Sequence, residues 1–261
     1  MNRIALGVEY AGTAYFGWQR QAAGPTVQGS VEQALSRVAD HPVTVVCAGR
    51  TDTGVHATGQ VVHFDSPAVR LPENWVRGAN AQLPADIRVQ WARQVDAAFH
   101  ARFSARRRHY RYIILNRPEP TALLHDRVCH ERLPLDVPRM QAGAGHLLGE
   151  HDFTSLRAAA CQARSPVRTV QRLEVARAGN WIYLDVTANA FLHHMVRCIA
   201  GMLIAVGRGE QEPQWVAQVL AARDRTLGGV NAPACGLYLA RVEYPPEFGI
   251  PGPCWLPACG E

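Results

Sequence analysis

Apolar positions near the start of the chain follow two different periods. They alternate along residues 2–10, as in a half-buried strand, and recur at helical spacing along residues 25–40, where Thr26 can cap the helix. The pattern then predicts strands over residues 43–49, 59–65 and 87–95 and a helix over residues 72–81. The predicted order is β-α-β-β-α-β.

The rest of the chain repeats this order more loosely. The pattern predicts strands over residues 106–115, 167–176, 181–188 and 236–242 and helices over residues 137–148, 191–206 and 213–222. Two such units are typical of an α+β fold with two ferredoxin-like halves, whose antiparallel sheets join and flank a cleft. We expect an N-terminal half over residues 1–104, a C-terminal half over residues 105–246 and a Pro/Gly-rich tail over residues 247–261.

The composition excludes several classes of protein. With 48% apolar and 19% charged residues among 261, the chain is neither disordered nor collagen-like. Its seven cysteines are scattered and form no CxxC pair, which indicates reduced thiols and no disulfide framework or zinc site. No signal peptide is recognisable, and His193, His194 and Arg197 interrupt the most apolar predicted helix. We therefore expect a cytoplasmic protein without a membrane span.

The basic residues are unusual in kind and in position. All 27 are arginine, against 22 acidic residues, which reflects either a GC-rich genome or selection for a group that grips phosphate. Five of them lie between Arg102 and Arg111, and strand alternation puts Arg106 and Arg108 on the same face as Tyr110. Basic runs with interleaved aromatics are typical of RNA binding, and a charged edge strand is the alternative. A second basic segment contains Arg157, Arg164, Arg168 and Arg172.

The loop over residues 49–57 carries the strongest sign of chemistry. Its sequence, GRTDTGVHA, places Arg50, Asp52 and two glycines between two apolar strands. Glycine permits backbone angles that other residues avoid, so this connection is suited to a special shape. Asp52 is the candidate reactive carboxylate, and a structural Asx-turn is the alternative.

Five blocks of the chain follow one another in a fixed order. They are GRTDTGVHATGQVVHFD, FHARFSARRRHYRYIIL, GEHDFTSLRAAACQARSPVRTV, FLHHMVRCIAGMLIAVGRG and APACGLYLARVEYP. Together they resemble the tRNA pseudouridine synthase A (TruA-type) family over roughly residues 4–246. The resemblance implies the pseudouridine synthase fold with a basic cleft, Asp52 as the nucleophile, Tyr110 packed against the target base and Arg197 as the partner of Asp52. Thr53 and the segment GGVNAPA depart from the family's pattern.

The resemblance also implies a reaction and a substrate. The protein would be an isomerase that converts uridine to pseudouridine at positions 38, 39 and 40 in the anticodon arm of tRNA, acting as a homodimer. Asp52 would attack the sugar C1′ or the base C6, or first remove a sugar proton, and none of these routes needs a metal or an organic cofactor. The residues expected to bind the RNA are Tyr110, Arg50, Arg106, Arg108, Arg164 and Arg168.

Three other interpretations use parts of the same pattern. A non-catalytic RNA-binding protein would keep the fold and the arginines without the reaction. A glycosidase would need a second carboxylate about 5–9.5 Å from Asp52, and no acidic residue beside the loop is an obvious candidate. A metal site at His193 and His194 would need a third ligand, which the sequence does not indicate.

Overall fold

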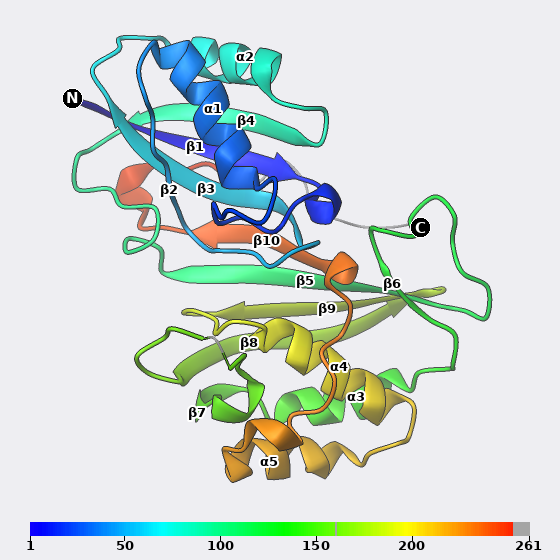
Figure 1. Cartoon of the computed structure of the whole chain (residues 1–261). Coiled ribbons are helices and arrows are strands. Elements are labelled where there is room, and N and C mark those ends of the chain that lie inside the picture. The colour runs from blue at the N-terminus through cyan, green and yellow to red at the C-terminus, as the bar shows by residue number, and fades with distance from the viewer. Residues whose placement is uncertain (160, 253–261) are drawn as a thin grey trace. The chain divides into compact units, whose positions relative to one another are not determined.

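The structure, a computed structural model, describes residues 1–159 and 161–252, which divide into two compact units. The first unit is Met1–Arg108 together with residues 238–252, and the second is His109–Leu237. One boundary falls inside strand β5 (Arg107–Asn116) and the other at the start of strand β10 (Leu237–Glu243). Each unit combines a sheet with covering helices, which confirms the predicted α+β class (Figure 1).

The first unit has the predicted β-α-β-β-α-β order. Its elements are β1 (Asn2–Tyr10), α1 (Val27–Ala39), β2 (Val46–Cys47), β3 (His56–Ser66), α2 (Pro72–Gln82) and β4 (Ile87–Val95). Strand β1 lies between β3 and β4 and is antiparallel to both, with Leu6 opposite Val62 and Ala92. Thr26 caps α1 as predicted, since its side chain accepts a hydrogen bond from the Gly29 backbone N–H. Helices α1 and α2 lie together on one face of this sheet (Figure 1).

Strand β10 differs from the prediction in both place and direction. It belongs to the first unit and not to the C-terminal half, and it runs parallel to β3, with Tyr238 opposite His56. Gly59 explains the close approach, because a Cβ there would lie 2.3 Å from the Ala240 carbonyl oxygen. The absence of a side chain at Gly59 therefore lets β10 lie alongside β3.

The second unit contains the remaining elements. They are β5, β6 (Cys129–Glu131), α3 (Val137–Gly145), β7 (Gly149–Asp152), β8 (Val167–Ala178), β9 (Trp181–Ala188), α4 (Met195–Gly207) and α5 (Pro213–Ala222). The sheet order is β5-β9-β8-β7, antiparallel at β7/β8 and β8/β9, with the short β6 parallel to β5. The sequence pattern did not predict β6 or β7, which are only three and four residues long.

Helix α4 begins later than predicted. It starts at Met195, because His194 adopts a left-handed backbone conformation with φ of 67° and ends the preceding extended segment. His193 is therefore outside the helix, and the predicted helical face shared by His193 and Arg197 does not exist. This correction leaves Arg197 in the first turn of α4.

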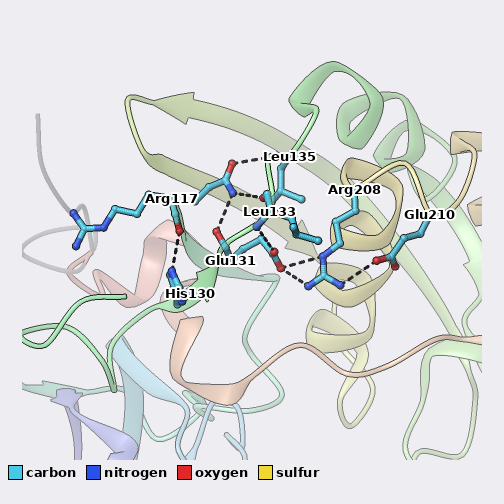
Figure 2. A network of polar contacts seen from close by, with 8 residues as sticks. Arg117, His130, Glu131, Leu133, Leu135, Arg208 and Glu210 are labelled. Carbon is cyan, nitrogen blue, oxygen red and sulfur yellow. Dashed lines mark hydrogen bonds and ion pairs between the residues drawn. The ribbon is translucent and has the colours of Figure 1, made fainter. Parts of the chain in front are cut away.

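A buried carboxylate ties β6 to the end of α4 (Figure 2). The Glu131 side chain, which is 5% exposed, accepts hydrogen bonds from the Leu133 backbone N–H at 2.9 Å and from Arg208 Nε at 3.1 Å. A second nitrogen of Arg208 also contacts Glu131, and a third lies 3.3 Å from Glu210. Hydrogen bonds to a charged and buried group are strong, so this cluster holds the second unit together.

The described part of the predicted tail is packed. Phe248 makes an edge-on contact with Phe99, and the Gly249 carbonyl accepts a hydrogen bond from Arg93. Cys254 and Cys259 lie outside the described residues. No helix among the residues described is both long enough and apolar enough to cross a membrane.

Candidate active site

Asp52 is held on a fixed loop between β2 and β3. Its side chain is half-buried, and its carbonyl accepts a hydrogen bond from the Val55 N–H at 3.1 Å, which closes a turn around Thr53 and Gly54. Thr51 beside it is buried, and its hydroxyl lies 2.7 Å from the Tyr10 hydroxyl. The carboxylate therefore sits on a loop anchored from within the first unit's core.

The segment 12–18 contacts this loop through backbone hydrogen bonds. Trp18 donates its backbone N–H to the Thr51 carbonyl at 3.0 Å, and Gly12 donates its own to His56 Nδ1 at 3.0 Å. Gly17, at φ of 80°, lies so close that a Cβ there would be 2.6 Å from the Thr51 carbonyl oxygen. Only glycine tolerates both the angle and the contact, so a residue far from the motif shapes the loop.

The entry to the loop is fixed by the fully buried Gln60. Its Nε2 donates to the Gly49 carbonyl at 2.6 Å, and its Oε1 accepts from the Gly49 N–H at 3.4 Å. The next residue, Arg50, has an exposed side chain, as expected for a group that binds RNA. The buried amide of Gln60 fixes the backbone of Gly49, and the side chain of the next residue, Arg50, is exposed to solvent.

Arg108 has a different place from the one predicted. Its guanidinium donates hydrogen bonds to three backbone carbonyls, those of Ala48, Arg102 and Ala105, at 3.1, 2.7 and 3.2 Å. The side chain is half-buried and joins the base of the Asp52 loop to the turn before β5. In the first unit it therefore acts as a positioning residue for this loop.

Tyr110 is a buried residue of β5. Its side chain is 8% exposed, and its ring meets Phe191 edge-on, with centroids 5.0 Å apart and an interplanar angle of 81°. An edge-to-face pair fixes the tilt of both rings. Phe191 lies between β9 and the start of α4.

Arg197 is clamped by the segment that departs from the family's pattern. Its Nε donates to the Ala232 carbonyl at 2.9 Å, and its own carbonyl accepts the Ala232 N–H at 3.0 Å. Asn231 adds contacts to Cys198 and His194. The GGVNAPA segment therefore orients the first turn of α4, including a half-buried Arg197 side chain.

The other predicted RNA-binding arginines differ in exposure. Arg106 and Arg164 have exposed side chains. Arg168 is half-buried and donates to the carbonyls of Ser165 and Val167, and burial lowers the pKa of its guanidinium. Asp52, Arg50, Arg106 and Arg108 belong to the first unit, whereas Tyr110, Arg164, Arg168 and Arg197 belong to the second.

The residues that sequence reasoning missed are supporting ones. Tyr10 and Gly17 lie outside the quoted sequence blocks, and Gln60 and Ala232 lie inside them at positions to which no role was assigned. The polar Gln60 directly before the apolar Val61 and Val62 was the one visible signal, because a buried amide must find hydrogen-bond partners.

Comparisons with known proteins show the family to which the chain belongs. The tRNA pseudouridine synthase family profile matches residues 7–104 and 144–245. A tRNA pseudouridine synthase A of Nitrosococcus oceani is 58% identical over 249 residues, 95% of this chain and 96% of that protein. Proteins of the same name from Vibrio cholerae and Coxiella burnetii are 56% and 54% identical over 98% of this chain, covering 98% and 100% of their own lengths. The chain therefore belongs to the tRNA pseudouridine synthase family, whose members are isomerases that convert uridine to pseudouridine in tRNA.

Proposed function

We propose that this protein isomerises uridines 38, 39 and 40 in the anticodon stem-loop of tRNA, with Asp52 as the nucleophile. The observation that carries the proposal is the construction of the Asp52 loop. Hydrogen bonds from Trp18 and Gln60 fix its backbone, and the Tyr10 hydroxyl holds the side chain of Thr51 beside the half-buried carboxylate. A preorganised carboxylate is what a covalent step on a sugar or base requires.

The chemistry balances with this one group. Uridine and pseudouridine are isomers, so no oxidant, reductant or second substrate is consumed. In every route the bond between the uracil N1 and the sugar C1′ breaks and a bond between C5 and C1′ forms, while C5 loses a proton and N1 gains one. In the covalent routes the carboxylate also forms a bond to C1′ or to the base C6, and this bond breaks again before release. In the elimination route it first takes a sugar proton. The target base must leave its stack, and the edge-fixed ring of Tyr110 is a suitable partner for it.

Arg197 is proposed to orient the Asp52 carboxylate during this step. The hydrogen bond that Arg197 Nε donates to the Ala232 carbonyl fixes the plane of the guanidinium, which suits a directed contact to a carboxylate. We also propose that the protein acts as a homodimer in the cytoplasm, and that Arg50, Arg106, Arg164 and Arg168 hold the RNA backbone.

Replacing the nucleophile tests the proposal. Asp52→Ala is expected to lower pseudouridine formation in an anticodon stem-loop RNA by on the order of 1,000-fold or more, because the covalent route is lost. Its affinity for the same RNA is expected to stay within about threefold, since the arginines are unchanged. Release of tritium from C5-labelled uridine measures turnover, and filter binding measures affinity.

Asp40→Asn is the matched control. It removes a carboxylate from the same unit at the C-cap of α1, and asparagine tolerates the left-handed conformation found there. Full activity is expected from this variant. Turnover by Asp52→Ala would reject Asp52 as the nucleophile. Equal RNA affinity in the variant and the wild-type protein, with no reaction by the wild-type protein, would favour the non-catalytic alternative.

A further inference from the structure

A large aromatic side chain stands exposed in the turn that precedes β5. Phe103 is 77% exposed, although it belongs to a well-packed unit. Its ring stacks at a 30° tilt on His100, with centroids 4.4 Å apart, and the Arg102 guanidinium lies 5.5 Å from its centroid. His100 therefore supports the Phe103 ring from within the protein.

The turn is held firmly by its own hydrogen bonds. His100 Nδ1 accepts the backbone N–H groups of Arg102 and Phe103, both at 3.2 Å. The His100 N–H donates to Ser104 Oγ at 3.0 Å, and the Ser104 N–H donates to the His100 carbonyl at 2.9 Å. Burial and the positive charges of Arg3 and Arg102 lower the pKa of His100, which keeps Nδ1 available as an acceptor.

The first unit's core anchors the same turn from below. The Ala101 N–H donates to the buried His63 at 3.1 Å, and the Ala101 carbonyl accepts from the Tyr244 hydroxyl at 2.6 Å. Phe99, at the start of the turn, is fully buried. Phe103 is thus exposed on a rigid support, so little backbone entropy is lost when a ligand stacks on it.

The surroundings of Phe103 carry positive charge. Residues 97–108 contain four arginines, of which Arg102 and Arg106 have exposed side chains and Arg107 lies 3.5 Å from Glu243. The turn also lies beside the Asp52 loop, because Arg108 bonds to the carbonyls of both Arg102 and Ala48. Burial raises the pKa of Cys47 to about 11, and the nearby charges of Arg50, Arg102 and Arg108 oppose this. A flat apolar surface amid guanidinium groups is complementary to an unpaired, phosphate-linked base.

We propose that Phe103, supported by His100 and flanked by Arg102, is a stacking site for an unpaired nucleobase of the RNA substrate. The inference rests on the proposed function, since it assigns part of that substrate to a second contact separate from the reacting uridine. It commits to single-stranded RNA as the occupant, because an exposed aromatic ring beside a guanidinium offers both the stacking surface and the phosphate contact that an unpaired nucleotide uses. The adjacent phosphate would contact Arg102.

Fluorescence of a modified RNA tests this site. The probe is an anticodon stem-loop RNA with 2-aminopurine at each unpaired loop position in turn, since its fluorescence falls when it stacks. The wild-type protein is expected to quench one position. Phe103→Ala is expected to abolish that quenching and to raise Kd and KM roughly 10-fold while kcat is unchanged, because stacking on an aromatic ring is sequence-tolerant but substantial. Phe103→Tyr should keep both properties.

Val69→Ala is the control, because Val69 is an 80% exposed apolar residue of the same unit outside the arginine-rich segment. Its Kd and quenching should match the wild-type protein. Unchanged quenching and Kd in Phe103→Ala would reject the stacking site, as would a change confined to self-association in sedimentation. An inactive Asp52→Ala beside an unaffected Phe103→Ala would reject this inference alone. An active Asp52→Ala would reject the proposed mechanism and leave the quenching result to stand.

Discussion

The loop and turn around Asp52 and Phe103 in the first unit use arginine differently from the strands and helices of the second unit, although the first unit also pairs Arg3 with Asp65. In the first unit, Arg50, Arg102 and Arg106 have exposed side chains beside the Asp52 loop and the Phe103 turn. In the second unit, Arg111 and Arg208 are bound to carboxylates. The comparison shows that the number of arginines in a segment does not measure the charge it offers to a ligand.

Arg111 illustrates the second use. Its guanidinium meets Asp185 through two hydrogen bonds of 2.7 and 2.8 Å and lies 5.1 Å from the centroid of Tyr183. The hydrogen bonds to Asp185 raise the pKa of Arg111 despite its burial. A bidentate pair of this kind holds β5 to β9 and is already neutralised, so it adds little to RNA binding.

The predicted second basic segment is also partly neutralised. Arg172 pairs with Glu174 at 2.6 Å, and Arg168 donates to carbonyls of its own segment. Arg164 has an exposed side chain and is the member of this segment best placed to meet phosphate. Spacing along the sequence could not reveal these internal contacts, because they depend on which strand lies alongside.

The largest expected effect is on stability, from removing an arginine that is paired with a buried carboxylate. Arg208→Leu would leave the buried Glu131 carboxylate without its partner and is expected to lower the free energy of unfolding by about 3 kcal/mol. The double variant Glu131→Gln/Arg208→Leu should recover most of this loss, since the amide keeps an acceptor for the Leu133 N–H. Urea unfolding followed by tryptophan fluorescence measures both. A double variant no more stable than Arg208→Leu would contradict the role of the buried charge.

A smaller effect is expected from acid in the first unit. Burial, with the charges of His100 and Arg3, lowers the pKa of His63 to about 4, below the value of about 6.5 for an unfolded chain. Between these pH values the unfolded state binds more protons. The contribution of His63 to the free energy of unfolding is therefore complete above pH ~6.5, and it falls by about 2 kcal/mol between pH 7 and pH 5.

Urea titrations at pH 7, 6 and 5 measure this loss, and His63→Gln is the matched variant. Glutamine offers an acceptor for the Ala101 N–H but does not titrate. The free energy of unfolding of this variant should therefore change less between pH 7 and pH 5. An equally steep acid loss in this variant would show that other groups cause it. Because His63 stays neutral in the folded protein down to about pH 4, the Phe103 turn keeps this acceptor over the whole range, and quenching of the RNA probe should not follow the loss of stability.

The smallest effect separates exposed from paired arginines in RNA binding. Arg106→Gln is expected to reduce the slope of log Kd against log salt concentration by about 0.7–0.9, as for one phosphate contact. Arg172→Gln should leave the slope unchanged, because its charge is already paired with Glu174. Filter binding at several salt concentrations measures both slopes. Equal changes in the two variants would remove the distinction between exposed and paired arginines.

The strongest periodic patterns predicted the elements well. The strand over residues 87–95 and the helix over residues 213–222 have the predicted bounds, and α2 is one residue longer. The pattern failed where a single backbone angle decided the outcome. His194 at φ of 67° delays α4, and apolar periodicity carries no information about that angle. Strand β10 was predicted as a strand, but its partner was not, since pairing depends on the approach permitted by Gly59.

The sequence by itself determined the α+β class, the family and the identity of Asp52, Tyr110 and Arg197 as candidates, because these rest on periodicity and on ordered motifs read along the chain. Only the tertiary structure decided which arginines face solvent, how Gly17 and Gln60 shape the Asp52 loop, and that Phe103 stands on a rigid turn. The physical reason is that burial and hydrogen-bond pairing join residues distant in sequence, so a side chain's partner is a property of the fold.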